Sequence, residues 1–365
     1  MGELALGTSL AGPVLVVGTG LLGTSIGLAL RRQGVQVLLR DVNPQNVTIA
    51  SSVGAGVDAD TMPEPEEPGL VVVAVPPDHL AEEIVAALKA GAAVVTDVGS
   101  VKAAPLHEVS ARVDASLLAH YVGSHPMAGS ERSGPFAASA ALFDGRPWAV
   151  TPHPGAEPRA VEVVTWLAGV CGASPVLLSP EEHDEAVART SHLPHLLAAL
   201  VAGRLAGAPD AHLTLSGQGV RDVTRIAAGD PGLWKQIIGS NGRAVAELLA
   251  SVRHDLDELI EAVGSGDRDR VGALLERGVA GTAAIPGKHG GPAQETAAVY
   301  VVVPDHPGEL ARLLADAGDI GVNVEDLRID HDPGRPVGLV ELTVAADRAD
   351  FLKGSLEGRG WTSHR

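Results

Sequence analysis

Short aliphatic runs alternate with segments of helical spacing over the first 178 residues. The runs are rich in Val and Leu, and they occupy residues 14–17, 35–39, 70–75 and 92–96, with 121–122 as a fifth candidate. A helical pattern of apolar positions follows the first run at residues 21–33. Strands separated by helices predict a parallel, doubly wound sheet of the Rossmann type. Residues 148–151 and 175–178 predict further, peripheral strands.

The pattern changes near Ser179. This serine is followed by a proline and two glutamates, which is a helix-start signal. Residues 181–205 have helical spacing that is interrupted at Pro194. Residues 233–263 carry three or four apolar positions per two turns, the pattern of an amphipathic helix. We therefore expect an all-α second domain over residues 179–280.

A third domain is predicted at the end of the chain. Residues 281–295 are rich in Gly and Pro and predict a linker. Strand and helix patterns then return in the order βαββα, with a short final strand expected at Trp361. The sequence thus predicts an α/β protein with domains at residues 1–178, 179–280 and 296–365.

Composition and charge narrow the classes of partner. The chain has 365 residues, of which 45% are hydrophobic, and its formal net charge of −18 argues against nucleic-acid or acidic-membrane partners. No uncharged apolar run reaches about 18 residues, and the N-terminus lacks a signal-peptide pattern, so we expect a cytoplasmic protein. Cys171 is the single cysteine, which excludes an intrachain disulfide and a cysteine-based zinc site.

The first strand leads into the motif Gly-Thr-Gly-Leu-Leu-Gly at residues 18–23. In a G-x-G-x-x-G turn before a helix, the glycines allow a tight turn, close approach of a pyrophosphate, and packing of the helix on the sheet. Asp41 ends the second strand, where a carboxylate favours NAD over NADP, although Arg40 beside it leaves NADP open. We expect NAD to be bound by Gly18, Gly20, Leu21, Leu22, Gly23, Asp41, Val75 and Ser100.

Four further segments are unusually polar for their surroundings, and they carry a family resemblance. They are Asp-Val-Gly-Ser-Val-Lys at 97–102, Gly-Ser-His-Pro-Met-Ala-Gly-Ser-Glu at 123–131, Ser-His-Leu-Pro-His at 191–195, and Arg-Asp-Val-Thr-Arg-Ile-Ala at 221–227 with Asp-Pro and Trp shortly after. With these motifs the sequence resembles the prephenate/arogenate dehydrogenases of tyrosine biosynthesis over nearly its whole length. The segment from about residue 296 resembles an ACT domain, a small regulatory module.

The resemblance implies the oxidative decarboxylation of prephenate, with the residues of this chain in specific roles. His125 matches the histidine that accepts a hydrogen bond from the substrate hydroxyl, and its ordinary pKa suits proton transfer. Ser100 matches a serine that orients this histidine and the nicotinamide. Arg225 matches the arginine that pairs with a substrate carboxylate, which an acidic protein needs. Further substrate contacts are expected from Ser130, Glu131, His183, His195, Asp222 and Trp234.

Several alternatives stay open on the sequence alone. The substrate could be arogenate, which differs from prephenate by an amino group in place of a keto group. A different ACT-linked NAD dehydrogenase, of the homoserine or phosphoglycerate type, or a catalytically dead amino-acid sensor would explain fewer of the motifs. A metal site at His183, His192 and His195 is disfavoured, since their spacing is not that of a helical ligand pair. We expect a homodimer through the helical domain and a tyrosine effector at the ACT-like domain.

Overall fold

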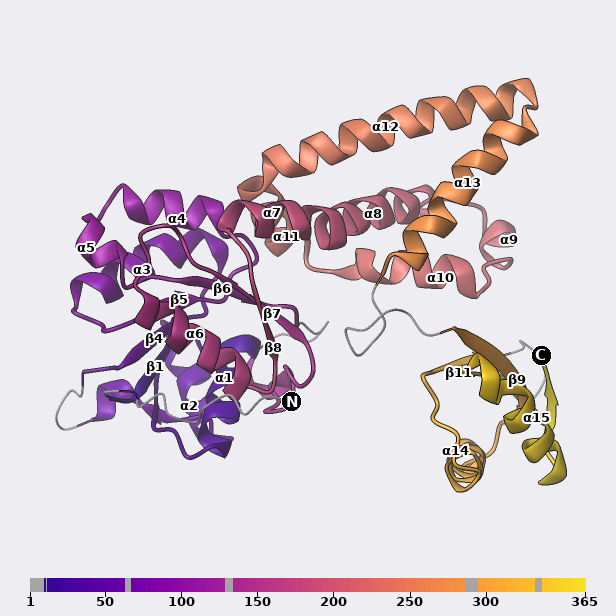
Figure 1. Cartoon of the computed structure of the whole chain (residues 1–365), viewed down its shortest axis with the longest axis horizontal. Coiled ribbons are helices and arrows are strands. Elements are labelled where there is room, and N and C mark those ends of the chain that lie inside the picture. The colour runs from indigo at the N-terminus through magenta and orange to yellow at the C-terminus, as the bar shows by residue number, and fades with distance from the viewer. Residues whose placement is uncertain (1–9, 11, 63–66, 129–133, 286–294, 332–336) are drawn as a thin grey trace. The chain divides into compact units, whose positions relative to one another are not determined.

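The computed structural model describes residue 10 and residues 12–62, 67–128, 134–285, 295–331 and 337–365 (Figure 1). By its internal contacts the chain divides into two compact units, Met1–Asp257 and Glu258–Arg365. The division falls inside helix α12 (Gly242–Ser265), whereas the sequence pattern places boundaries near residues 178 and 281–295. The difference arises because the first helices after residue 179 pack on the N-terminal sheet domain and so belong to the first unit.

The first unit is built on a five-stranded parallel sheet with the order β3-β2-β1-β4-β5. Its strands are β1 (Val14–Val17), β2 (Val37–Arg40), β3 (Val57–Asp58), β4 (Leu70–Val73) and β5 (Val95–Asp97). Val14 of β1 lies opposite Val37 on one side and Leu70 on the other. This strand order is that of dinucleotide-binding domains. The predicted doubly wound sheet is confirmed, with the two-residue strand β3 as an addition.

Helices cover both faces of this sheet, as Figure 1 shows. They are α1 (Leu21–Arg32), α2 (Pro44–Ser52), α3 (Leu80–Lys89), α4 (Ala103–Ser110), α5 (Ala115–Leu118) and α6 (Pro158–Val170), with short 3₁₀ turns η1 (Ala59–Thr61) and η2 (Pro77–His79). Val14 and Val16 belong to the core under α1, α2 and α6, while Leu15 and Val17 belong to the core under α3 and α4. Side chains alternate between the faces of a strand, so β1 is apolar throughout because both of its faces are buried.

A second, three-stranded sheet with the order β6-β7-β8 follows the fifth parallel strand. Its strands are β6 (Gly123–Pro126), β7 (Pro147–Thr151) and β8 (Ser174–Leu177), and the 3₁₀ turn η3 (Pro135–Ala137) lies between the first two. The strand expected at residues 121–122 is only a single parallel bridge between Tyr121 and Val95. The chain then leaves the parallel sheet and pairs β6 antiparallel with β7, which sets His125 opposite Ala149.

The helical part begins with α7 (Pro180–Val187), whose N-terminus is a capping box between Ser179 and Glu182. The expected interruption near Pro194 is a π-helical turn, η4 (Ala188–His192), and Pro194 itself lies in the first turn of the next helix. The remaining elements of this part are α8 (Leu193–Leu205), α9 (Asp210–Leu213), α10 (Gln218–Thr224), η5 (Arg225–Ala228), α11 (Pro231–Ser240) and α12.

The prediction of a single helix over residues 233–263 is wrong. The helix is interrupted at Asn241, between α11 and α12. Asn241 is buried, and its side-chain amide donates to the backbone oxygen of Asp184 at 2.8 Å. The periodicity of apolar residues continues across the break, so the sequence pattern does not reveal it.

The second unit holds α13 (Arg268–Ala283) and a four-stranded antiparallel sheet with the order β10-β11-β9-β12. Its other elements are β9 (Thr296–Pro304), α14 (Glu309–Asp319), β10 (Asp326–His331), β11 (Val337–Ala345), η6 (Ala346–Arg348), α15 (Ala349–Gly358) and β12 (Thr362–His364). The βαββα pattern with a short last strand is confirmed. Of the predicted linker, residues up to Ala283 belong to α13, and 286–294 lie outside the described residues.

Among the described residues, no helix combines the length and the apolar character needed to cross a membrane.

The glycine turn yields a stability prediction. A Cβ on Gly23 would lie 1.9 Å from the backbone oxygen of Gly18, whereas a Cβ on Gly20 would meet no atom within 4 Å. Gly23→Ala should therefore lower the free energy of unfolding by about 1–3 kcal/mol, as overpacking does. Gly20→Ala, the control, meets no steric clash and should cost less, about 0.5–1 kcal/mol, because alanine is a poorer N-cap residue than glycine. Equal thermal midpoints for the two variants would show that the turn has room at both positions.

Candidate active site

The turn between β1 and α1 has the geometry that a dinucleotide requires. Gly18 has a φ of 95°, and a Cβ there would meet the backbone oxygen of Ala74 at 2.5 Å and Cγ1 of Val75 at 3.1 Å. The space beside Gly20 is open, and no side chain caps the N-terminus of α1 at this residue. Uncapped N–H groups and the helix dipole favour an anionic group at this position. These residues therefore fit the pyrophosphate of a dinucleotide.

Hydrogen bonds to the Asp41 side chain connect this turn to the end of β2. Its carboxylate accepts hydrogen bonds from the backbone N of Thr19 at 2.6 Å, from the Thr19 hydroxyl at 3.0 Å, and from the backbone N of Asn43 at 2.8 Å. The neighbouring Arg40 side chain is half exposed and points toward Asp60, with 3.7 Å between Nε and the carboxylate. The sequence does not predict that the Asp41 side chain is hydrogen-bonded to the glycine turn.

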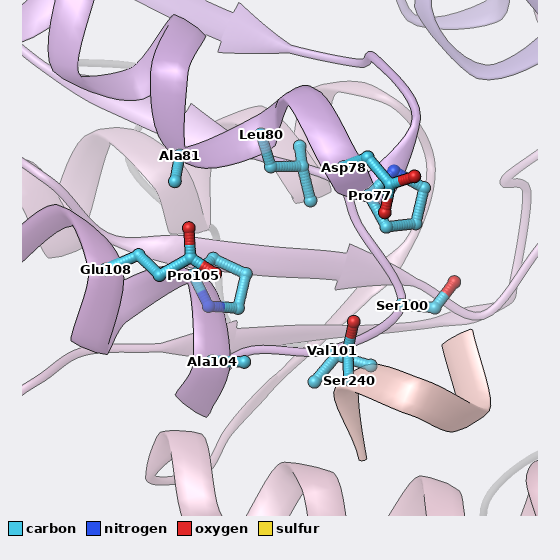
Figure 2. A pocket seen from close by; sticks show the side chains of 10 residues that line it. All are labelled: Pro77, Asp78, Leu80, Ala81, Ser100, Val101, Ala104, Pro105, Glu108 and Ser240. Atoms are coloured by element: carbon cyan, nitrogen blue, oxygen red, sulfur yellow. The ribbon is translucent and has the colours of Figure 1, made fainter. Parts of the chain in front are cut away.

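Ser100 lies in the loop after β5 and lines a small surface cavity, seen in Figure 2. The cavity is bordered by Pro77 of η2 and by Ser240 at the end of α11. Ser100 was expected to orient His125. In the described part of the chain, however, Nδ1 of the His125 ring lies 2.9 Å from Nε2 of His183.

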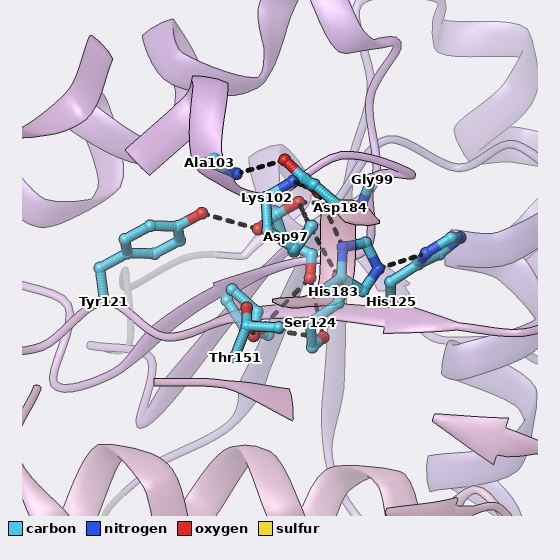
Figure 3. A network of polar contacts seen from close by, with 12 residues as sticks. Asp97, Gly99, Lys102, Ala103, Tyr121, Ser124, His125, Thr151, His183 and Asp184 are labelled. Atoms are coloured by element: carbon cyan, nitrogen blue, oxygen red, sulfur yellow. Dashed lines mark hydrogen bonds and ion pairs between the residues drawn. The ribbon is translucent and has the colours of Figure 1, made fainter. Parts of the chain in front are cut away.

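A buried ion pair lies beneath the loop after β5 (Figure 3). The Lys102 ammonium contacts the Asp97 carboxylate, with both side chains at 1% exposure or less, and it donates to the backbone oxygen of Ser124 at 2.7 Å. The Tyr121 hydroxyl donates to the same carboxylate at 2.8 Å. Burial lowers the pKa of Lys102, and the attraction of Asp97 opposes that shift. The pair joins β5 to β6 directly before His125.

Asp184 connects α7 to the same loop. Its carboxylate accepts hydrogen bonds from the backbone N of Lys102 at 2.8 Å and of Ala103 at 2.9 Å. One of its oxygens lies 2.8 Å from Nδ1 of His183, whose Nε2 lies 2.9 Å from Nδ1 of His125. Asp184, His183 and His125 thus form a continuous row that ends at the strand β6, as Figure 3 shows. Both ring nitrogens of His183 are engaged in this row, and the expected contact of His183 with the substrate stays a prediction.

A second cluster lies where α8 and α11 approach one another. Trp234 stacks on His195 with ring centroids 3.5 Å apart, and it meets His192 edge-on at 6.1 Å. His192 Nδ1 lies 3.2 Å from the Asn241 amide, which also bonds Asp184. In the described ranges, no group of three or more His, Cys, Asp or Glu side chains is arranged to hold a metal ion.

The other expected substrate residues lie on α10 and η5 or outside the described residues. Asp222 is exposed on α10 and accepts a hydrogen bond from Gln218 at 2.9 Å. Arg225 opens η5 with an exposed side chain, and α10 and η5 both pack against α8. Ser130 and Glu131 fall in residues 129–133, which are not described.

Burial keeps the histidines of the row and of the neighbouring cluster neutral at pH 7. Desolvation lowers the pKa of His125 well below its usual value, and the nearby His183 and Lys102 lower it further. It also lowers the pKa of His183, against the opposing hydrogen bond to Asp184. The pKa of His192 falls from 6.5 to about 4, mainly because the ring is buried. A neutral imidazole can accept a proton, so His125 has the protonation state that a general base requires.

Two family descriptions cover most of the chain. Residues 26–177 match the prephenate dehydrogenase nucleotide-binding domain. Residues 179–277 match the prephenate dehydrogenase dimerization domain.

Individual relatives agree with this match. The probable prephenate dehydrogenase NovF of Streptomyces niveus is 37% identical over 96% of this chain and 99% of its own length. The structure of Aquifex aeolicus prephenate dehydrogenase with hydroxyphenyl propionate and NAD⁺ is similar with a TM-score of 0.66 and 29% identity, over 74% of this chain and 97% of that one. Synechocystis arogenate dehydrogenase is similar with a TM-score of 0.62 and 26% identity, over 74% of this chain and 98% of that one.

The buried histidines predict a pH-dependent stability. An unfolded chain binds a proton at each histidine near pH 6.5, but the folded protein does so only at lower pH. Between these values the unfolded state holds more protons, so stability falls as the pH falls. For His192, with a folded pKa of about 4, the loss between pH 7 and pH 5 is on the order of 2 kcal/mol.

Urea unfolding at the two pH values measures this loss. His192→Gln should make the dependence shallower, and His212→Gln, at an exposed histidine, should leave it unchanged. Equal slopes for the two variants would contradict the burial effect.

Proposed function

The chain belongs to the prephenate dehydrogenase family, and we propose that it oxidises prephenate with NAD⁺ to 4-hydroxyphenylpyruvate and CO₂. The observation that carries the proposal is a neutral His125 held in a row with His183 and Asp184. The glycine turn with open space at Gly20 supports NAD, as does the bound NAD⁺ of the Aquifex relative.

The chemistry assigns His125 two successive tasks. NAD⁺, when bound, accepts the hydride from the ring carbon that carries the hydroxyl. His125 takes the hydroxyl proton as the carbon–oxygen double bond forms. The bond to the ring carboxylate then breaks, CO₂ leaves, and the electron pair enters the ring and passes to the oxygen. That oxygen recovers the proton from His125, so the histidine acts first as base and then as acid.

Binding of the substrate needs a local positive group, because the chain carries a net charge of −18 and prephenate is a dicarboxylate. We assign Arg225 to a substrate carboxylate, since a guanidinium binds carboxylates through two parallel hydrogen bonds. The stacked pair of His195 and Trp234 supplies a flat aromatic surface for the substrate ring. We also propose Ser130, Glu131 and Asp222 as substrate residues and Ser100 as a nicotinamide contact.

The cofactor is proposed to be NAD rather than NADP. Asp41 ends β2 with a carboxylate that would repel a 2′-phosphate. Arg40, which could neutralise such a phosphate, points toward Asp60 instead. Leu21 and Leu22 open α1, and Val75 lies against Gly18, so these residues complete the proposed cofactor site.

A homodimer through the helical region is also proposed. The match of residues 179–277 to a dimerization domain supports it. Large apolar side chains on α12 and α13 are exposed in the single chain, among them Ile260, Val263, Leu275 and Val279. Pairing of two copies would bury such residues in a symmetric interface.

Arogenate is the alternative substrate, favoured by the similarity to the Synechocystis arogenate dehydrogenase. The preferred substrate and the preferred cofactor can be tested in one experiment. Prephenate and arogenate are each combined with NAD⁺ and with NADP⁺, and the formation of NADH or NADPH is followed by absorbance. We expect the highest kcat/KM with prephenate and NAD⁺. Absence of turnover with both substrates would refute the proposed function.

Substitution of the histidine tests the mechanism. His125→Asn keeps a polar group but cannot take the proton, so kcat should fall roughly 10²–10⁴-fold. KM should change little, because the carboxylate contacts of the substrate are elsewhere. A variant with the turnover of the unmodified enzyme would remove His125 from the reaction.

The C-terminal domain is proposed to bind tyrosine and to lower activity. Gly308 has a φ of 93° at the start of α14, and no side chain caps that helix. A ligand carboxylate can bind to such an N-terminus. End-product inhibition requires a coupling of about 1–3 kcal/mol between the two sites.

A chain that ends at residue 291 tests this proposal, since the Aquifex relative matches 97% of its own length without covering the whole of this chain. We expect tyrosine to inhibit the full-length enzyme and to inhibit the shortened one much less. Equal inhibition of both would place tyrosine at the active site instead.

A further inference from the structure

We propose that Asp184 and His183 are positioning residues that determine which ring nitrogen of His125 carries the hydrogen, leaving Nε2 bare to accept the substrate proton. This inference rests on the proposed function for its catalytic meaning. Its structural content, the tautomer of His125, can be measured without any substrate.

The assignment of hydrogens starts at Asp184. Two backbone N–H groups, those of Lys102 and Ala103, donate to its two oxygens. An ionised carboxylate can only accept hydrogen bonds. The 2.8 Å contact between Asp184 and Nδ1 of His183 therefore requires the hydrogen on Nδ1 of His183.

That hydrogen fixes the next contact in the row. The His183 ring is neutral because burial lowers its pKa, so a hydrogen on Nδ1 leaves Nε2 with a lone pair. The 2.9 Å contact from this Nε2 to Nδ1 of His125 then requires the hydrogen on Nδ1 of His125. Since burial also keeps the His125 ring neutral, its Nε2 carries no hydrogen and presents a lone pair.

The row is held rigidly at both ends. Asp184 is bonded at its carboxylate to the loop that begins α4, and at its backbone oxygen to the Asn241 amide. At the other end, Lys102 bonds the backbone oxygen of Ser124, the residue before His125. The His183 side chain is only 1% exposed, so water does not compete for its nitrogens. The tautomer is therefore set before the substrate arrives.

The same row favours the proton transfer itself. When Nε2 of His125 takes the hydroxyl proton, the ring becomes positive and its Nδ1–H becomes a stronger donor to His183. The row ends in the negative charge of Asp184, which faces this new positive charge through one intervening ring. Without His183, the hydrogen of His125 is free to occupy Nε2, and a ring in that form cannot act as the base.

The tautomer can be read directly from the ring nitrogens. Long-range ¹H–¹⁵N spectra of the full-length protein labelled with ¹⁵N-histidine distinguish a protonated nitrogen from a bare one, and His125→Asn identifies the His125 signals. We expect a protonated Nδ1 and a bare Nε2 at pH 7. The opposite pattern overturns the proposal whatever the protein's activity, whereas an enzyme inactive on both substrates would refute the proposed function and leave the tautomer measured.

Kinetics of a matched pair of variants give the second readout. His183→Leu removes the acceptor for His125, and we expect kcat to fall roughly 10²-fold while KM for prephenate stays within about twofold. His153→Leu is the control, because His153 is also buried and, within the described residues, its ring nitrogens bond the backbone of Leu118 and Gly155. This control should lower the thermal midpoint without a comparable loss of kcat. An unchanged kcat in His183→Leu, or equal losses in both variants, overturns the proposal.

Discussion

A buried carboxylate must find its hydrogen-bond donors within the protein, and Asp184 finds them on the loop before α4 and on its own helix α7. It receives two backbone N–H groups from the loop that begins α4 and one ring nitrogen from its own neighbour His183. An unpaired carboxylate in the interior is strongly unfavourable, so the loop that begins α4 is held in one position relative to α7. Helix α7 therefore has a fixed position against the nucleotide-binding domain, and this position brings His183 and Asp184 into one row with His125.

A second buried pair, Lys102 with Asp97, holds β5 and β6 in a fixed position relative to each other. It lies where the chain leaves the parallel sheet and enters the three-stranded one. Tyr121 and Ser124 complete the partners of this pair, so the change of direction occurs at a place with little freedom. Rigid polar contacts around a reacting group reduce the reorganisation needed during reaction. The histidine on β6 thus has a defined backbone as well as a defined ring.

The sequence predicted the architecture well, because the fold depends on local patterns. Apolar runs such as Val14–Val17 and the glycine spacing after them specify strands, helices and the turn. The site was harder to predict from the sequence, because its contacts join residues far apart in the chain. His125 and His183 are 58 positions apart, and Lys102 and Asp184 are 82 apart. The motif at residues 97–102 contains both Ser100 and Lys102, and the sequence does not show that Lys102 is the buried one of the two. The break at Asn241 was invisible because a polar residue between two helical stretches looks like an exposed position.

The carboxylate of Asp41 has a consequence for redesign of coenzyme preference. Two hydrogen bonds from Thr19 join this side chain to the glycine turn. The residue that we propose to discriminate between the two nicotinamide coenzymes therefore also holds the glycine turn in place, and one substitution would change both roles together. An enzyme converted to the phosphorylated coenzyme would need a compensating change at position 19, so that the turn keeps its closure by another donor and acceptor. Evolution of this preference is accordingly expected to proceed through paired changes at positions 19 and 41.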